Sequence, residues 1–311
     1  MSDSDYDVVI AGGGIAGLTA GLVSARAGRR TRVLTGPALG GHLLSIERID
    51  GYPGFPDGIA GYDLCPMVQE QAVAAGAEFV ASVVTGLAPD EGRWRVTTGD
   101  GEVRARAVVI ATGTRSKVLG IPGEARLRGK GVSHCASCDG PMLRTRVVGV
   151  VGGGDSALQE ALTLARFASR VVVLHRGTTL AAQAAYRQSV RDHATVEVRM
   201  STVVEEVLGD TALTGVRMRT TTDGTQTELQ LAGLFVYVGL TPDTAWLDGT
   251  LELDPSGGIP TDDAMRSRLP GLFAAGTVRS GSAGRAASAA GDGATAAVAA
   301  DRYLSDDTWR V

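Results

Sequence analysis

Residues 5–34 read DYDVVIAGGGIAGLTAGLVSARAGRRTRVL. The apolar run at 6–11 predicts a strand, Gly12, Gly14 and Gly17 follow it as G-x-G-x-x-G, and a helix and a second strand at 32–34 complete the unit. The first glycine allows the tight turn, the second lets the backbone approach a pyrophosphate, and the third brings helix and strand together. Because the N–H groups at the helix start bind such an anion, this stretch predicts a dinucleotide site.

The same pattern occurs a second time at residues 146–176, RVVGVVGGGDSALQEALTLARFASRVVVLHR. Two glycines repeat and Ala157 replaces the third, while the second strand is followed by His175-Arg176-Gly177 without an acidic residue. An acid there binds the 2′-OH of NAD, whereas arginine accommodates the 2′-phosphate of NADP. We therefore expect NADPH, with NADH possible, at the following residues: Gly152, Gly154, Asp155, Ser156, Ala157, His175 and Arg176.

Two such units with near-continuous apolar strands predict an α/β protein of two Rossmann-like three-layer domains, each with a parallel sheet covered on both faces. A helix is expected at 62–75, and an Ala-rich helix from about Asp292 to Leu304 closes the chain.

A cysteine pair, Cys135-Ala136-Ser137-Cys138-Asp139, lies just before the second unit. Cysteines at this spacing can close a small disulfide ring, and one thiolate typically has a lowered pKa. Asp139 can donate and accept protons for thiol chemistry. A zinc site would need two further ligands; His134 could supply one, but a fourth is missing. The pair therefore predicts redox chemistry without a metal, while Cys65, in an apolar helical pattern, is expected in the core.

Length and charge narrow the class of protein. The chain has 311 residues, enough for about two domains, and a net charge of −4, which argues against a nucleic acid or an anionic membrane as partner. No run approaches the roughly 18 apolar residues of a membrane helix. The acidic start, Met1 to Asp7, lacks the features of a signal peptide, so a cytoplasmic protein is expected.

Taken together, the motifs resemble those of the low-molecular-weight thioredoxin reductases over nearly the whole chain. In chain order they are Gly12–Gly17, Gly40-Gly41, Tyr52-Pro53-Gly54, Ala111-Thr112-Gly113, Gly131-Val132-Ser133, Cys135–Gly140, Gly152–Ala157, His175-Arg176 and Phe273–Gly276. The resemblance implies an FAD-binding domain built from residues 1–115 and 246–311, an inserted NAD(P)-binding domain at 116–245 that carries the cysteines, and a homodimer.

The resemblance also implies a site and a mechanism. The FAD site would comprise Gly12, Gly14, Ala16, Gly17, Gly41, His42, Asp50, Ala111, Thr112, Gly113, Gly276, Thr277, Arg285 and Ala286. NADPH would pass a hydride to flavin N5, and the reduced flavin would reduce the disulfide. Cys138 would face the flavin C4a, Cys135 would attack the external disulfide, and Asp139 would supply the proton. The inserted domain would rotate about hinges at 113–117 and 238–241.

Several positions depart from the family pattern. Thr277 stands where an Asp usually binds the ribityl chain, Gly284-Arg285 replaces Arg-Gln, and His42 replaces a frequent Gln. Gly177 and Ala181 stand where the family has further phosphate-binding arginines, and aromatics after the Cys pair are replaced by Pro141-Met142-Leu143. These changes predict weaker FAD binding, a less strict coenzyme preference and a less defined thioredoxin-docking surface.

The leading hypothesis is a flavin-dependent disulfide reductase that moves electrons from NAD(P)H to thioredoxin or a similar small disulfide substrate. The alternatives are a dithiol oxidase of the same fold, a ferredoxin-dependent variant, and a flavin-binding redox sensor without turnover. Asp139 and the intact second loop favour the reductase, whereas Thr277 and the single Arg176 leave the dithiol oxidase as an alternative.

Overall fold

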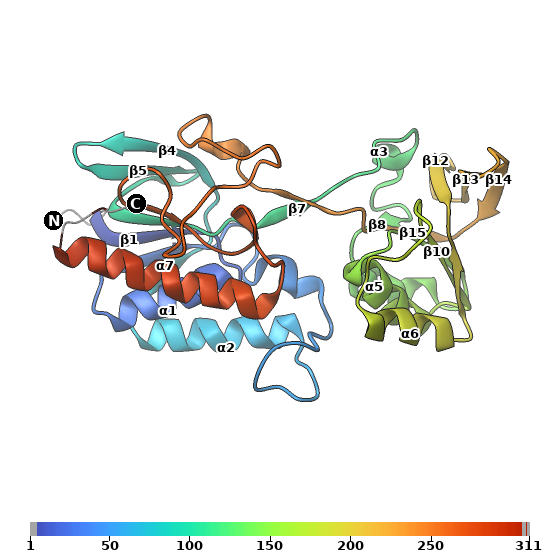
Figure 1. Cartoon of the computed structure of the whole chain (residues 1–311), viewed down its shortest axis with the longest axis horizontal. Helices are drawn as coiled ribbons and strands as arrows, with labels where there is room; N and C mark the ends of the chain where they lie inside the picture. The colour runs from blue at the N-terminus through green and yellow to red at the C-terminus, as the bar shows by residue number, and fades with distance from the viewer. Residues whose placement is uncertain (1–4, 307–308, 310–311) are drawn as a thin grey trace. The chain divides into compact units, whose positions relative to one another are not determined.

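The computed structural model describes residues 5–306 and 309, which form two compact units (Figure 1). The first unit comprises residues 1–115 and 241–311, and the second comprises residues 116–240. The second segment of the first unit thus begins at 241, where the sequence analysis expected 246. Which coenzyme each unit binds stays a prediction.

A seven-stranded sheet forms the centre of the first unit, with strand order β3-β2-β1-β6-β5-β4 and β17 also paired with β6. Its strands are β1 (Asp5–Ala11), β2 (Thr31–Leu34), β3 (Glu78–Val80), β4 (Val84–Asp90), β5 (Arg93–Thr98), β6 (Gly101–Ile110) and β17 (Leu272–Ala274). Strands β3, β2, β1, β6 and β17 are parallel, while β4 and β5 continue the sheet antiparallel. Strand β6 therefore joins the parallel and the antiparallel parts of the sheet.

Helices cover one face of this sheet: α1 (Ile15–Arg26), α2 (Gly61–Ala74) and α7 (Ala286–Asp306) (Figure 1). Val8 and Ile10 of β1 belong to the core under these helices, and Val9 and Ala11 to the core on the opposite face. This alternation follows from the two-residue period of a strand. Three short 3-10 helices, η1 (Gly41–Ser45), η3 (Ala245–Leu247) and η4 (Gly276–Val278), connect the elements.

Helix α7 begins at Ala286, six residues before the expected start at Asp292 (292 − 286 = 6). Its first turns are rich in alanine, the best helix former, and so extend the helix toward its N-terminus. Gly293 allows α7 to lie against α1, because a Cβ at Gly293 would overlap the Ala16 carbonyl oxygen. The helix expected at 62–75 is α2, shifted by one residue at each end.

The second unit has an all-parallel sheet of order β11-β10-β9-β15-β8. Its strands are β8 (Val132–Ser133), β9 (Val147–Val151), β10 (Arg170–Leu174), β11 (Val196–Arg199) and β15 (Gly233–Val236). One face packs against α5 (Asp155–Ala165) and α6 (Ala184–Asp192). The other packs against an antiparallel sheet of β12 (Thr202–Leu208), β13 (Gly215–Thr220) and β14 (Gln226–Gln230). The short helices are α3 (Glu124–Leu127), α4 (Ala136–Asp139) and η2 (Gly140–Leu143).

The sequence repeat is a structural repeat. In each unit the first glycine of the loop donates its N–H to the end of the second strand, from Gly12 to Leu34 and from Gly152 to Leu174. The predicted α/β class with two Rossmann-like domains is confirmed. Two short strands, β7 (Thr114–Ser116) and β16 (Leu240–Pro242), pair where the chain passes between the units. They coincide with the expected hinges, whose motion stays a prediction.

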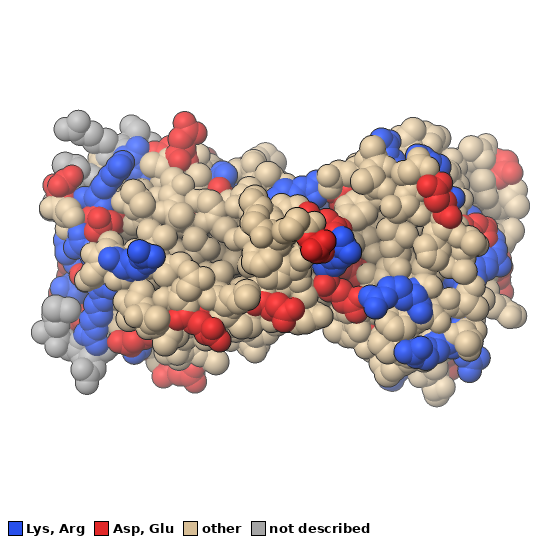
Figure 2. Space-filling view, turned by 90° about the horizontal axis from the view of Figure 1, so that it is seen from below, with Lys and Arg blue, Asp and Glu red and all other residues tan. Residues whose placement is uncertain are grey.

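Within 5–306 and 309, no helix combines the length and apolar character needed to cross a membrane. In the same residues, no group of three or more His, Cys, Asp or Glu side chains is arranged to hold a metal ion. Acidic and basic side chains intermingle on the face shown in Figure 2, without a large patch of one sign.

Candidate active site

The loop after β1 has the geometry of a pyrophosphate cradle. Gly12 has a φ of +123°, and a Cβ there would overlap the Ala111 carbonyl oxygen. A Cβ at Gly17 would overlap the Gly12 carbonyl oxygen, so the third glycine fixes the packing of α1 on the loop. A Cβ at Gly14 would meet nothing within 4 Å, although Gly14 is the N-cap of α1. The loop is therefore tight on its protein side and open where a pyrophosphate would bind.

Other predicted FAD residues gather at the carboxyl ends of the neighbouring strands. The Gly40 N–H donates to the Gly13 carbonyl over 2.8 Å, and a Cβ on Gly41 would lie 3.5 Å from the Gly14 Cα. After β6, a Cβ on Gly113 would lie 3.5 Å from Thr277 Oγ1, which places the segments after β6 and β17 side by side. Parallel α/β sheets bind ligands at this edge.

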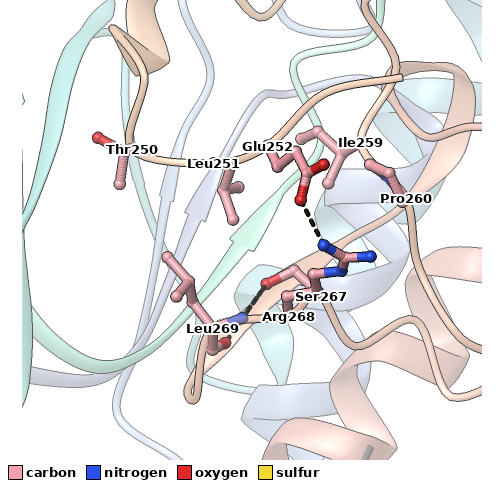
Figure 3. Close-up of a pocket in the computed structure, with 8 residues that line it drawn as sticks. All are labelled: Thr250, Leu251, Glu252, Ile259, Pro260, Ser267, Arg268 and Leu269. Carbon is pink, nitrogen blue, oxygen red and sulfur yellow. Dashed lines mark hydrogen bonds and ion pairs between the residues drawn. The ribbon is translucent and has the colours of Figure 1, made fainter. Parts of the chain in front are cut away.

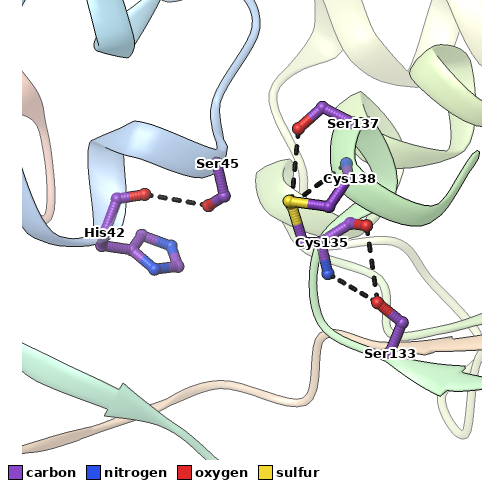
Figure 4. The surroundings of a disulfide bond; sticks show 6 residues. All are labelled: His42, Ser45, Ser133, Cys135, Ser137 and Cys138. Carbon is purple, nitrogen blue, oxygen red and sulfur yellow. Dashed lines mark hydrogen bonds between the residues drawn. A yellow bond between two sulfur atoms is a disulfide. The ribbon is translucent and has the colours of Figure 1, made fainter. Parts of the chain in front are cut away.

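Three further predicted FAD residues have partners within the protein, two through their side chains and His42 through its backbone. The Thr112 hydroxyl donates to the Asp243 carbonyl over 2.8 Å. Asp50 forms an exposed ion pair with Arg48. His42 lies in η1, and its carbonyl accepts a hydrogen bond from Ser45 (Figure 4). Their expected contacts with FAD stay predictions.

The remaining predicted FAD residues lie around the start of α7. Gly276 has a φ of +78°, and a Cβ there would lie 2.9 Å from the Cβ of Ala16. Ala286 is the first residue of α7, and Arg285 directly precedes it, with its carbonyl bonded to the Ala289 N–H. These residues lie near the start of α1 as well as that of α7, and their contacts with FAD stay predictions.

A buried ion pair that the sequence did not predict supports this cradle. On α7, Asp292 accepts hydrogen bonds from Arg279 Nε at 2.7 Å and from the Gly276 N–H at 3.1 Å. The two charged side chains are only 10% and 18% exposed. An aspartate between two glycines in an Ala-rich helix was the available indication. Asp292 therefore fixes the turn that carries Thr277 to the body of α7.

Replacing Asp292 by Asn should lower the free energy of unfolding by about 3 kcal/mol, because Arg279 would remain buried without its counter-charge. Urea unfolding at saturating FAD measures the change. Arg268→Ala is the matched control, since its ion pair with Glu252 is 75% and 72% exposed and should change stability by less than about 1 kcal/mol. Equal effects of the two substitutions would contradict the structural role of Asp292.

The Arg268–Glu252 pair lines a shallow pocket of about 170 Å³ in the first unit (Figure 3). Its lining residues are Thr250, Leu251, Glu252, Ile259, Pro260, Ser267, Arg268 and Leu269. None of the predicted site residues is among them, and we assign it no function.

The loop after β9 repeats the cradle in the second unit. Gly152 has a φ of +150°, and a Cβ there would overlap the Tyr237 carbonyl oxygen. A Cβ on Gly154, the N-cap of α5, would meet nothing within 4 Å. Asp155 accepts two hydrogen bonds of 2.7 Å from Gln183, which ties the start of α5 to the segment before α6. The loop is open at the same position as in the first unit.

The histidine after β10 packs against two glycines, Gly153 and Gly177. His175 Nε2 lies 3.0 Å from the Thr179 carbonyl oxygen, and a Cβ on Gly153 would overlap the imidazole ring. A Cβ on Gly177 would lie 2.8 Å from His175 Nε2, the far end of a side chain. Arg176 is exposed and forms no ion pair with any residue that the structure describes.

The cysteine pair forms a disulfide across the four-residue helix α4, with its Cα atoms 5.3 Å apart. Cys135 is the N-cap of α4, and its N–H donates to Ser133 Oγ over 3.0 Å (Figure 4). Asp139 is partly exposed and donates its N–H to the Cys135 carbonyl. Cys65 is fully buried, as expected, and burial raises the pKa of its thiol to about 11. The reactive sulfurs therefore belong to the pair.

Comparisons with known proteins show the family of this chain. The family model described as pyridine nucleotide-disulphide oxidoreductase matches residues 6–294. A thioredoxin reductase of Treponema pallidum is 40% identical over 302 residues, with 97% of this chain and 98% of that protein covered. The crystal structure of Lactococcus lactis thioredoxin reductase matches with a TM-score of 0.94 at 36% identity, covering 97% of this chain and 99% of that one. The crystal structure of T. acidophilum thioredoxin reductase matches with a TM-score of 0.93 at 33% identity, covering 98% of this chain and 99% of that one.

Proposed function

The chain belongs to the pyridine nucleotide-disulphide oxidoreductases, and within them to the thioredoxin reductases, and we propose that it reduces the disulfide of thioredoxin with electrons from NADPH. One observation carries the proposal: a closed Cys135–Cys138 disulfide directly precedes the second of two glycine loops that are both open at their middle glycine. An enzyme that links two dinucleotides to a dithiol requires these three parts.

The residues of the first unit fit FAD. The N–H groups at the start of α1 would hold its pyrophosphate, because Gly14 leaves that space empty of side chains. Thr277 would offer its hydroxyl to a ribityl oxygen, a weaker partner than the carboxylate usual in the family. Arg285 and the start of α7 would face the electron-rich edge of the ring. When bound, FAD supplies the transfer of two electrons between a nicotinamide and a disulfide.

The cysteine pair would then perform thiol–disulfide exchange. The Cys135 thiolate attacks one sulfur of the substrate disulfide, forming a mixed disulfide and releasing the other sulfur as a thiolate, to which Asp139 supplies a proton. Cys138 gives its proton to the Asp139 carboxylate and, as a thiolate, attacks Cys135 Sγ and closes the Cys135–Cys138 disulfide; the second substrate sulfur leaves and takes up that proton. Two electrons pass from the pair to the substrate.

The family also leads us to propose a cytoplasmic homodimer that acts on thioredoxin or a similar small dithiol protein. Sedimentation of the purified protein tests the dimer. Turnover with thioredoxin, compared with turnover of a small-molecule disulfide, tests the partner.

Anaerobic stopped-flow spectra separate this proposal from its alternatives. Rapid bleaching of the flavin by NADPH, followed by transfer to a disulfide, is expected. Bleaching by dithiothreitol but not by NADPH or NADH would favour a dithiol oxidase, for which Thr277 and the single Arg176 are the favouring observations. Bleaching only by a low-potential donor would indicate a ferredoxin-type enzyme, and no bleaching by any donor would indicate a redox sensor.

Replacing Arg176 by Ala should lower kcat/KM for NADPH by about 10- to 100-fold, because one charge-assisted contact to the 2′-phosphate is lost. The value for NADH should change by less than about twofold, since NADH lacks that phosphate. Because Gly177 adds no second guanidinium after Arg176, the wild-type preference for NADPH should be modest.

Arg191→Ala serves as the control, since Arg191 is an exposed residue of α6 that bonds to Gln188. Steady-state kinetics with both coenzymes measure the change in all three proteins. An equal loss for NADPH and NADH in Arg176→Ala would refute Arg176 as the reader of the 2′-phosphate.

A further inference from the structure

The hydrogen bonds around the disulfide are distributed unequally between its two sulfurs. Cys135 Sγ lies 3.2 Å from the Cys138 N–H nitrogen, which donates to it, and 3.4 Å from Ser137 Oγ (Figure 4). Within the described residues, no hydrogen bond reaches Cys138 Sγ. Cys138 is exposed, whereas Cys135 is partly buried. The two cysteines thus have different surroundings although they are three residues apart.

The hydroxyl is the donor in the contact between Ser137 and Cys135. Neither sulfur of a disulfide carries a proton, so only the Ser137 O–H can supply the hydrogen. After reduction the same O–H would face the Cys135 sulfur, and a thiolate accepts a hydrogen bond more strongly than a neutral sulfur does. A hydrogen bond to the charged form stabilises that form and lowers the thiol pKa.

The surroundings hold this contact in place. The Cys135 N–H donates to Ser133 Oγ over 3.0 Å, and the Ser133 hydroxyl lies 3.4 Å from the Cys135 carbonyl oxygen. Ala136, between Cys135 and Ser137, is fully buried in the core that packs on α5. The backbone from Ser133 to Ser137 is therefore fixed independently of the disulfide, so that Ser137 stays close to Cys135 Sγ when the bond opens.

We infer that Ser137 is a catalytic residue that stabilises the Cys135 thiolate and thereby selects Cys135 rather than Cys138 as the attacking sulfur. The inference rests on the proposed function, in which the reduced pair attacks a substrate disulfide. In that step the Ser137 O–H keeps its proton and donates a hydrogen bond to the thiolate, which forms the mixed disulfide. The substrate sulfur that leaves takes its proton from Asp139.

The test measures the ionisation of each cysteine in the dithiothreitol-reduced protein. Iodoacetamide alkylation between pH 5 and 10, read peptide by peptide by mass spectrometry, gives separate rates for Cys135 and Cys138. In the wild type, Cys135 should react with a midpoint below the ordinary thiol value of about 8.5 and faster at pH 7 than Cys138. In Ser137→Ala the Cys135 midpoint should rise by about 0.5 to 1 pH unit, with a rate about 3- to 10-fold lower at pH 7.

Two further features separate this role from a general structural one. Above about pH 10 the Cys135 rates of wild type and Ser137→Ala should converge, because both thiols are then ionised and the more basic thiolate is at least as nucleophilic. Ser137→Thr keeps the hydroxyl and should restore the rate at pH 7 to within about twofold. A structural defect would lower the rate at every pH and would not be restored in this way.

An unchanged Cys135 midpoint in Ser137→Ala, or faster alkylation of Cys138 than of Cys135 in the wild type, would overturn the inference. Alkylation uses neither NADPH nor thioredoxin, so its outcome is independent of the proposed function. A flavin that NADPH cannot bleach, together with a shifted midpoint, would refute the reductase and leave the role of Ser137 standing. Normal turnover together with an unshifted Cys135 midpoint would refute the role of Ser137 and leave the reductase standing.

Discussion

A Cys138→Ser variant is expected to lose NADPH-driven disulfide reduction by at least about 1,000-fold, the scale seen when a nucleophile is removed from a catalytic unit. Without the Cys138 sulfur the Cys135–Cys138 disulfide of the structure cannot form, so there is no bond for electrons to reduce. The mixed disulfide on Cys135 also has no neighbouring thiol to resolve it. Bleaching of the flavin by NADPH should persist within about threefold, because the two glycine loops are untouched.

Cys65→Ala is the matched control. The Cys65 thiol is fully buried and its pKa is raised to about 11, so almost none of it is thiolate at neutral pH. We expect its turnover to stay within about twofold of the wild type. Stopped-flow bleaching and steady-state reduction of thioredoxin, measured on both variants, give the comparison. If Cys138→Ser retained full turnover, the electrons would have to reach the substrate by a route that avoids the pair.

The sequence predicted the shape of the two glycine loops, where backbone geometry leaves one choice of residue. Glycines 12 and 152 have positive φ and approach a carbonyl oxygen too closely for any Cβ, and glycines 14 and 154 both face open space. These requirements are local, so a G-x-G-x-x-G pattern between a strand and a helix expresses them directly. The parallel sheets follow in the same way from apolar strands separated by helices.

The parts that the sequence did not predict depend on distances between side chains of distant segments. The pair of Arg279 and Asp292 joins two elements 13 residues apart, and only the packing of α7 on α1 shows that it is buried. The convergence of donors on Cys135 Sγ requires coordinates as well. A sequence pattern gives residue types and their spacing, whereas these contacts depend on where the side chains point in the folded chain.

The second large effect is expected for Gly17→Ala in the first loop. Its Cβ would overlap the carbonyl oxygen of Gly12, a backbone atom of a turn that is itself pinned against Ala111. Relief would require α1 to move away from β1, which opens the core between them. We expect the free energy of unfolding of the FAD-free protein to fall by at least about 4 kcal/mol, and the purified variant to be colourless.

Gly14→Ala separates this effect from loss of the ligand. Its Cβ would meet no protein atom within 4 Å, and the φ of −75° suits any residue, so the FAD-free protein should lose less than about 1 kcal/mol. The added methyl would instead occupy the space in which we expect the pyrophosphate, and FAD affinity should fall at least about tenfold. Urea unfolding without FAD and fluorescence titration with FAD measure the two quantities separately. If Gly17→Ala kept wild-type stability, the packing role of the third glycine would be contradicted. If Gly14→Ala kept wild-type affinity for FAD, the proposal that the pyrophosphate binds at this loop would be contradicted.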